Sequence, residues 1–306
     1  MKNKERICPK CKSKEIKKDG KRKTENRGKV QRYKCKCCSN IFITDPFARM
    51  RNTPQKITCA LDLFFRGLST RGVQEHFKAF FSHNSDHSTI LRWIRKYSIQ
   101  ISKYTDKLNI QSGSYIEVDE MEFHRRKFHK AKLGIDKNWL INGIDVKTRF
   151  LINSTYVKNR NKKELKSVLN KIKDKTQDRV KIVTIDGLTT YTNLVKKTWG
   201  YDNKLGKHKI THKVVTASKG EGFNIWVERV HNSIRQRTHS FRGLHGSIHS
   251  AYSLMKGIEI YYNFIKKHEA LNYKTTSELA IPELKFETPN RWLELIKRML
   301  CPERTF

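Results

Sequence analysis

The chain has 306 residues, enough for two or three domains, and its 65 Lys and Arg against 29 Asp and Glu give a net charge of +36. No apolar run approaches the roughly 18 residues of a membrane-spanning helix, and the basic start lacks the apolar core of a signal peptide. With 37% hydrophobic residues the chain can build cores, which excludes wholesale disorder. An AT-rich genome would inflate the Lys count, yet it would not explain the scarcity of acids. The composition therefore predicts a soluble, intracellular protein without membrane association, whose partner is DNA or RNA.

Five of the seven cysteines lie within the first 38 residues, and four of them form two CxxC pairs with 23 residues between the pairs. Tetrahedral Zn²⁺ takes four thiolates, and each CxxC turn presents two. The spacing predicts structural Zn²⁺ in a zinc ribbon over residues 1–48, with four ligands: Cys8, Cys11, Cys35 and Cys38. Cys37 is an alternative to Cys38, but Phe42 follows Cys38 by four residues, which resembles the closing turn of zinc ribbons. A disulfide framework is the other alternative, and the lack of a secretory signal argues against it.

The segment between the two CxxC pairs is basic and polar. We expect it to form a hairpin with Asp19-Gly20 at the turn. Residues 1–51 hold 18 Lys and Arg against five Asp and Glu, so contact with the phosphate backbone of a nucleic acid is the favoured role. A purely structural or protein-docking ribbon is the alternative.

Three amphipathic helices are expected within residues 52–100. Thr53-Pro54 fits an N-cap followed by proline at the first helical position. A second helix follows Gly67, and a third runs over 88–97 with three residues inward: Ile90, Leu91 and Ile94. The arrangement resembles a helix-turn-helix domain whose third helix contacts DNA through its outward side chains: Thr89, Arg92, Arg95 and Lys96. A small helical bundle with a merely solvated basic face is the alternative.

From residue 115 the pattern changes to strands. We expect five strands, with a helix over 161–173 between the third and fourth and another helix after the fourth, in these ranges: 115–123, 138–145, 149–157, 180–187 and 208–215. This succession predicts an α/β core. Within it and just beyond it stand three acids: Asp119, Asp186 and Glu228. Well-separated carboxylates that meet only in the fold suit hard cations such as Mg²⁺ at a phosphoryl-transfer site.

Four segments carry a resemblance to a known family: VDE at 118–120, TIDG at 184–187, VERVHNSIRQRTHSFRGL at 227–244 and YYNFIKKHEALNYKTTSELA at 261–280. Residues 110–285 resemble the ribonuclease H-like core of DDE transposases and retroviral-type integrases, and among these the insertion-sequence transposases of bacteria and archaea. The resemblance implies an α/β fold with a mixed five-stranded sheet and flanking helices. Several members place a zinc ribbon and a helix-turn-helix domain before the core, as expected here. Residues 286–306 are expected to form a C-terminal helix with three inward residues: Trp292, Leu295 and Ile296.

The same resemblance implies the chemistry. Asp119 matches the acid on the central first strand, Asp186 the acid at the end of the neighbouring fourth strand, and Glu228 the acid of the following helix. Each is expected to bind Mg²⁺ or Mn²⁺, and Arg235, seven residues after Glu228, is expected to meet substrate phosphate. The implied activity is that of a prokaryotic, nucleoid-associated transposase. It would bind the terminal inverted repeats of its element and catalyse DNA strand cleavage and strand transfer as a homo-oligomer.

Two residues are candidates for the third acid, Glu228 and Glu221. The 41 residues between Asp186 and Glu228 exceed the spacing usual in the family, and Glu221 fits that spacing better. Glu228 is preferred because its context is helical and Arg235 shares its helical face, whereas Glu221 is flanked by glycines and is held in reserve. The extra residues suggest an insertion after the fifth strand. His231 is expected either to contact substrate or to be a core or salt-bridging histidine.

The sequence leaves alternatives for the metal ligands and for the function. Asp145 and Glu117 are rival metal ligands without family context, and Glu120 is expected to be a supporting acid. The alternative functions are a domesticated, non-catalytic DNA-binding regulator and a stand-alone metal-dependent nuclease.

Overall fold

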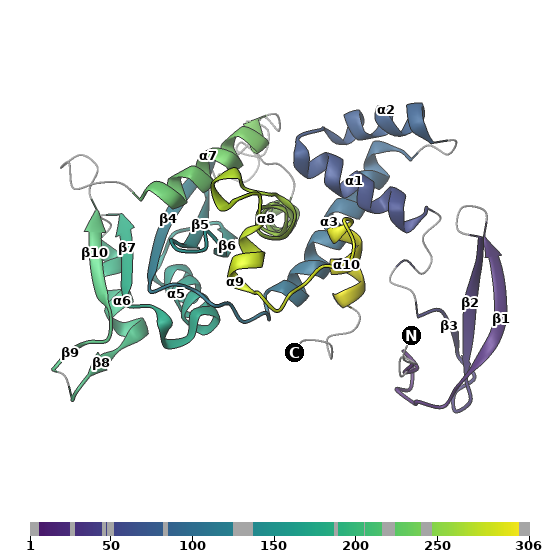
Figure 1. The fold of residues 1–306 in the computed structure, drawn as a ribbon, viewed down its shortest axis with the longest axis horizontal. Helices are drawn as coiled ribbons and strands as arrows, with labels where there is room; N and C mark the ends of the chain where they lie inside the picture. The colour runs from purple at the N-terminus through teal and green to yellow at the C-terminus, as the bar shows by residue number, and fades with distance from the viewer. Residues whose placement is uncertain are drawn as a thin grey trace.

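The computed structural model describes ten stretches of the chain: 6–24, 28–44, 47, 52–81, 85–124, 137–186, 189–204, 206–215, 224–239 and 247–299. For Asp186 the description covers the backbone only. Figure 1 shows three parts in these stretches, namely a small N-terminal sheet, a helical unit and a larger sheet flanked by helices. Among the described helices, none has both the length and the apolar character needed to span a bilayer.

The N-terminal sheet is antiparallel, with strands in the order β1-β2-β3: β1 Ile16–Thr24, β2 Gly28–Cys35 and β3 Ile41–Phe42. The predicted turn at Asp19-Gly20 is wrong. The register shifts between Lys18 and Lys21, so these residues form an irregularity within β1, where Gly20 adopts a positive φ of 64°. Pairing continues to Thr24 opposite Gly28, and the chain reverses between those two residues.

The helical unit contains three helices from the middle of the sequence and one from its end: α1 Pro54–Arg66, α2 Thr70–Phe80, α3 His87–Thr105 and α10 Arg291–Met299. The predicted cap of α1 is confirmed, because the Thr53 side chain accepts a hydrogen bond from the Lys56 N–H and Pro54 begins the helix. Helix α3 extends eight residues past its predicted end at 97, since its buried stripe continues through Ile101 and Tyr104. The expected domain boundary at 100 therefore falls inside a helix.

The C-terminal helix joins this unit rather than the larger sheet. Its three predicted inward residues are buried. The Trp292 ring stacks on Phe65 of α1 at a centroid distance of 5.4 Å, and the Asn290 side-chain amide donates to Thr58 at 2.9 Å. The end of the chain thus closes the helical unit that the segment after residue 52 begins.

The larger sheet has five strands in the order β10-β7-β4-β5-β6: β4 Tyr115–His124, β5 Lys137–Asp145, β6 Leu151–Val157, β7 Ile182–Asp186 and β10 Thr211–Val215. Strands β4, β5 and β6 pair antiparallel, whereas β7 pairs parallel with both β4 and β10. The predicted mixed five-stranded α/β sheet is confirmed. Its first strand is central and its fourth strand is the neighbour, as expected.

Helices cover both faces of this sheet (Figure 1). On one face lie α5 Lys162–Thr176 and α6 Thr189–Trp199, with the 3₁₀ turn η1 Gln177–Arg179 after α5. On the other lies α7 Ile225–His239, whereas α8 Ile248–Ile260 packs against the edge strand β6. Short elements complete the described chain: β8 Tyr201–Asp202, β9 Lys207–His208, the π-helix η3 Tyr261–Ile265, the 3₁₀ turn η4 Glu269–Leu271 and α9 Thr276–Ala280.

The predicted insertion after the fifth strand is not tested by the described residues. The β8–β9 hairpin stands before β10, between Asp186 and Glu228. The predicted insertion, residues 216–223, lies outside the described part of the chain.

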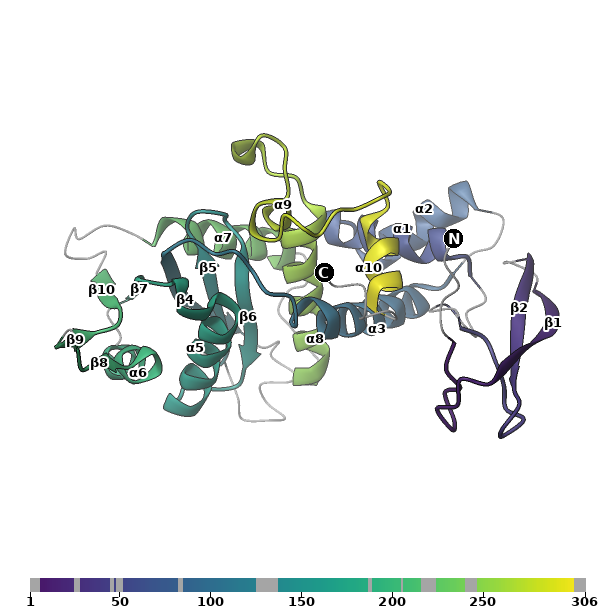
Figure 2. The same cartoon turned by 60° about the horizontal axis from the view of Figure 1, so that its bottom comes forward.

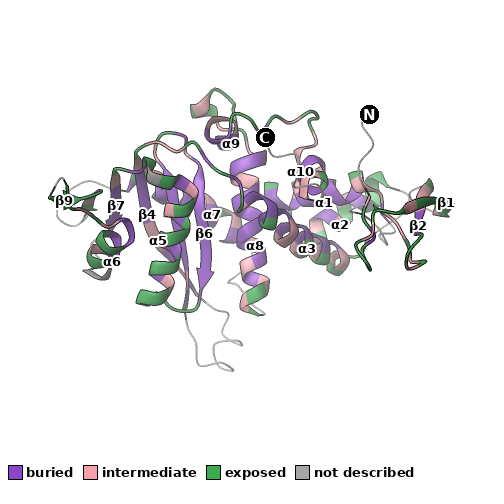
Figure 3. Ribbon diagram, turned by 90° about the horizontal axis from the view of Figure 1, so that it is seen from below, coloured by how far each residue is buried: buried purple, intermediate pink, exposed green. Residues whose placement is uncertain are grey.

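Helix α8 stands between the sheet and the helical unit (Figures 2 and 3). A Cβ at Gly257 would collide with Phe65 and Ser98, so only glycine allows this close approach to α1 and α3. Next to it, Lys256 Nζ lies 2.9 Å from Glu259 and 3.1 Å from Asp106, just beyond α3. Burial alone would lower the pKa of Lys256, but the two acids raise it. Buried charge and close packing together fix the helical unit on the sheet.

Candidate functional site

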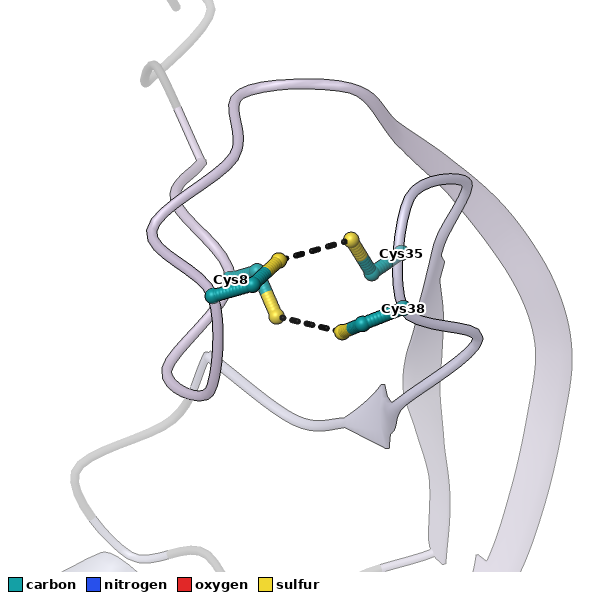
Figure 4. Close-up of side chains that lie close together, drawn as sticks. Cys8, Cys35 and Cys38 are labelled. Atoms are coloured by element: carbon teal, nitrogen blue, oxygen red, sulfur yellow. Dashed lines mark hydrogen bonds between the residues drawn. The ribbon is translucent and has the colours of Figure 1, made fainter.

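The first candidate site is a cluster of four thiols in the N-terminal segment (Figure 4): Cys8, Cys11, Cys35 and Cys38. All four sulfur atoms lie within 4.8 Å of one another. The Cys8 and Cys38 sulfurs are 3.6 Å apart, and those of Cys11 and Cys35 are 3.5 Å apart. Four thiolates at 2.3 Å from one tetrahedral ion would be separated by about 3.8 Å. The cluster therefore fits Zn²⁺ in ligand type, number and spacing.

Two equivalent turns hold the thiols. In each, the N–H of the first cysteine bonds to the carbonyl five residues on, from Cys8 to Ser13 and from Cys35 to Asn40, both at 2.9 Å. Each turn also has a residue with positive φ directly after its second cysteine, namely Lys12 at 61° and Ser39 at 55°. The second turn is a copy of the first, shifted by 27 positions along the chain.

The equivalence of the two turns distinguishes Cys38 from Cys37, the alternative fourth ligand. Cys37 occupies the place that Lys10 takes in the first turn, and both side chains are exposed. Cys38 occupies the place of Cys11 and faces the other sulfurs. The structure thus brings together the four cysteines that the spacing predicted and leaves Cys37 outside the cluster.

The second candidate site is built on the two central strands of the five-stranded sheet. In the parallel pair β4–β7, Val118 is in register with Ile185. Asp119 and Asp186 are the next residues, so they occupy adjacent positions on neighbouring strands, about 5 Å apart at the backbone. Because alternate residues of a strand share a face, Asp119 belongs to the face that carries Glu117, and backbone position 186 is its neighbour on β7. That face lies under α7.

Glu117 fixes the start of α7 over these acids. Its Oε2 accepts hydrogen bonds from the backbone N–H groups of Trp226 at 2.8 Å and Val227 at 3.0 Å. The first N–H groups of a helix have no partner within the helix, so this buried carboxylate caps α7 from a neighbouring strand. Burial raises the pKa of Glu117, although the two N–H donors act in the opposite direction. Glu117, a rival ligand in the sequence, is a helix cap in the structure.

His231 makes the second contact between α7 and β4. Its Nδ1 lies 3.5 Å from Asp119 Oδ2, and its side chain is only 2% exposed. Burial, with a smaller effect from the charge of Arg235, lowers the pKa of His231 to about 3, so the ring is neutral at neutral pH. Of the two expectations for this residue, the core position is the one observed.

Glu228 precedes His231 by three residues, about 4.5 Å along the helix axis, and its side chain is exposed. With α7 held at Glu117 and at Asp119, Glu228 stands on the first turn of the helix that covers both aspartates. Glu221, the reserve for the third acid, lies outside the described residues. The described side chains contribute the carboxylates of Asp119 and Glu228, beside backbone position 186 of β7, and carboxylate oxygens are the donor type that Mg²⁺ and Mn²⁺ prefer.

Two other acids of the core have structural partners. Asp145 is fully buried and accepts hydrogen bonds from the Gly113 N–H at 2.9 Å and from the N–H and hydroxyl of Thr148 at 2.9 and 2.6 Å. Glu120 points to the opposite face of the sheet, where it accepts from the Tyr191 hydroxyl at 2.7 Å and pairs with Arg160 at 3.2 Å. Asp145 thus closes a turn, and Glu120 ties β4 to α6.

Sequence reasoning missed Asn142, which lies opposite Asp119 in the antiparallel pair β4–β5. It is fully buried, and neither atom of its amide has a hydrogen-bond partner within the described residues. Buried polar groups nearly always have hydrogen-bond partners. The Asn142 amide can therefore still bond to a further group beside Asp119. Nothing in the sequence singles out Asn142, because only the strand register places it there.

The predicted DNA-contacting residues lie on the first half of α3, where Arg92 and Lys96 are exposed and Thr89 and Arg95 are half-buried. The Arg92 guanidinium donates to the Thr89 hydroxyl at 2.8 Å. Of the three residues predicted inward, two are fully buried, but Leu91 is only half-buried.

The residue that sequence reasoning overlooked on this helix is Trp93, which is buried beside Ile94. On α7, Arg235 is exposed and donates to Asn232 at 3.0 Å.

No family model matches the sequence, and neither does any curated protein. Among solved structures, the intasome of simian T-cell lymphotropic virus in complex with the PP2A regulatory subunit B56 gamma matches with a TM-score of 0.37 and 13% identity, over 77% of this chain and 78% of that chain. The Drosophila P element transposase strand transfer complex matches with a TM-score of 0.36 and 14% identity, over 82% of this chain and 65% of that chain. Similarity at these scores carries no argument about fold or activity.

Proposed function

We propose that the protein is the DNA transposase of an insertion sequence, which binds the terminal inverted repeats of its element and catalyses metal-dependent strand cleavage and strand transfer. The observation that carries the proposal is the register of β4 and β7, which gives Asp119 and Asp186 adjacent positions beneath the helix that bears Glu228. The strand order β6-β5-β4-β7-β10, with the acids on the central strand and its parallel neighbour, supports a ribonuclease H-like core.

Three carboxylates would hold the catalytic ions: Asp119, Asp186 and Glu228. When bound, Mg²⁺ or Mn²⁺ supplies the Lewis acidity that activates a water or 3′-hydroxyl and stabilises the leaving oxygen of the phosphodiester. The side chains of this chain position the site. His231 holds the carboxylate of Asp119, Glu117 holds α7, and Arg235 is exposed on the same helix for contact with substrate phosphate.

DNA binding is assigned to two surfaces. The first is the exposed half of α3. The second is the β1–β2 hairpin, where Lys17 stands directly opposite Lys34 and Lys23 opposite Lys29. Like charges in cross-strand pairs destabilise a sheet, and a phosphate backbone would relieve the repulsion. Neutralising about 8 phosphates would give a slope of roughly −7 in log K against log salt. Pairing of two element ends implies a homo-oligomer.

The test uses purified protein, Mg²⁺ and labelled DNA that spans the end of the element. The wild type is expected to cleave at the end and to join the 3′-hydroxyl to target DNA, and Asp119→Asn is expected to abolish both while end affinity is kept. Asp174→Asn is the matched control, because Asp174 is an exposed acid on α5, across the sheet from the site. A wild type that binds the end without cleaving it would indicate a DNA-binding regulator. Cleavage by Asp119→Asn would refute the site.

A further inference from the structure

Near the C-terminal end of α7, the Arg237 side chain contacts the helical unit. Its Nη2 donates hydrogen bonds to the backbone carbonyls of Phe64 and Leu68, the latter at 3.3 Å, and its guanidinium lies 4.4 Å from the centre of the Phe64 ring. These carbonyls belong to the last turn of α1 and to the turn that leads into α2, next to the cap residue Gly67. The last carbonyls of a helix lack intrahelical partners and carry its negative dipole end. Arg237 therefore caps α1 from another helix.

The cap is a half-buried cation. Burial lowers the pKa of Arg237 to about 10, so the guanidinium keeps its charge at neutral pH. Removal of a buried charge from water is costly unless hydrogen bonds compensate, and here carbonyl groups supply them. An apolar side chain could fill the same space, but it could not bond to the two carbonyls.

Helix α7 is thus fixed at both ends to different parts of the molecule. Glu117 of the sheet caps its start, and Arg237 at its end caps α1. Figure 1 shows α7 running from the sheet towards α1. Glu228 lies between the two joints, nine residues or about 14 Å before Arg237 along the helix. A shift of the α1–α2 turn would therefore be passed along α7 to Glu228.

The α1–α2 turn is also linked to the helix that is assigned to DNA. It leads directly into α2, and the Gln74 side chain of α2 accepts a hydrogen bond from the His87 N–H, the first residue of α3, at 3.1 Å. Thr89 and Arg92 follow within the next turns of α3. A continuous set of hydrogen bonds and helices thus connects the first turns of α3 with Arg237.

We propose that Arg237 is a positioning residue through which DNA held by α3 stabilises the placement of α7 and hence of Glu228. The inference rests on the proposed function, because the ligand that it requires is the double-stranded DNA at the end of the element. DNA on α3 restrains the α1–α2 turn, and the turn restrains α7 through the two carbonyl contacts. Binding of the element end thereby positions Glu228 over Asp119 and Asp186.

Two measurements test this link. The first is hydrogen exchange at the Trp226 and Val227 amides, without Mg²⁺ so that no cleavage occurs. End DNA is expected to slow their exchange about fivefold in the wild type and to leave it unchanged in Arg237→Ala. Arg237→Lys, which keeps a cationic donor, is expected to retain part of the effect. Arg298→Ala is the matched control, because Arg298 also donates to a backbone carbonyl, that of Lys285, but lies on α10.

The second measurement is a double-mutant cycle on the cleavage rate at saturating end DNA. Arg237→Ala is expected to reduce the rate about tenfold with end affinity kept within about twofold, and to have little further effect once Arg92 and Arg95 are both alanine. A tenfold loss in both backgrounds would show a local structural role, and a parallel loss of end affinity would show a DNA contact; either result overturns the inference. A wild type whose α7 amides do not respond to DNA overturns it as well. If they respond as expected but no cleavage occurs, the proposed catalysis fails and the link stands.

Discussion

The segment before residue 45 and the rest of the described chain are stabilised by different means. Up to residue 44, the buried apolar residues of the described part are few: Cys8, Tyr33 and Cys35. The helical unit and the five-stranded sheet instead share one continuous apolar core, which Figure 3 shows in purple around α8. A segment of this size buries too little surface to fold alone, and metal ligation by the four thiols would supply the missing stability. The difference predicts two parts that unfold independently.

Metal removal is expected to have the largest effect. Structural zinc sites contribute about 10–16 kcal/mol of apparent binding free energy, so a strong chelator should unfold residues 6–44 and leave the remaining structure intact. Amide NMR spectra of the full chain, with and without chelator, check this. Cys38→Ser should reproduce the effect, whereas Cys37→Ser should leave the spectrum folded because Cys37 lies outside the cluster. Equal effects of the two substitutions would contradict the assignment of the ligands.

A substitution where α8 packs against α1 and α3 should lower the stability of the helix–sheet unit alone. Gly257→Ala places a methyl group against Phe65 and Ser98, and overpacking of this kind costs about 1–3 kcal/mol. Urea unfolding followed by tryptophan fluorescence should show a lower midpoint for the helix–sheet unit. The signals of the N-terminal segment should stay unchanged. Added Phe65→Leu should restore part of the stability, and its failure to do so would place the strain elsewhere.

Loss of the α7 cap tests how the sheet positions the acids. Glu117→Ala leaves two helix N–H groups without their acceptor and is expected to cost about 1–2 kcal/mol. Hydrogen exchange at Trp226 and Val227 should accelerate, and Glu117→Gln should have a smaller effect because its side-chain oxygen still accepts. If Mn²⁺ affinity fell while these amides stayed protected, Glu117 would be a metal ligand and not a cap.

The smallest expected effect is on the pH dependence of the stability of the helix–sheet unit. Burial alone would raise the pKa of Glu278, but hydrogen bonds from the Thr275 N–H and from Arg291 lower it to about 2. A lowered folded-state pKa stabilises the fold above the unfolded value of about 4.3, and this is lost as pH falls towards 2. Since the side chain is 36% exposed, the contribution is about 1 kcal/mol or less. Glu278→Gln should flatten stability between pH 5 and 2, and an unchanged slope would rule the contact out.

The sequence predicted features that local chemistry determines. The two CxxC turns, the Thr53-Pro54 cap and the five strands follow from side-chain type and spacing over a few residues. The central place of the strand that carries Asp119 came from family resemblance, and the register of β4 with β7 agrees with it.

Features that depend on long-range pairing were not predictable. Glu117 as a cap, Asn142 beside Asp119 and Arg237 on α1 all depend on which segments become neighbours in space. The mistaken turn at Asp19-Gly20 has the same origin, because a local signal for a turn also suits a bulge inside a longer hairpin.

The most direct test of the central claim is anomalous scattering from crystals of the protein with end DNA and Mn²⁺. The account predicts manganese bound by the carboxylates of Asp119, Asp186 and Glu228, next to the phosphate at the end of the element. Manganese held by Glu117, Asp145 or Glu221 in place of these residues, or no manganese at the β4–β7 face, would contradict it.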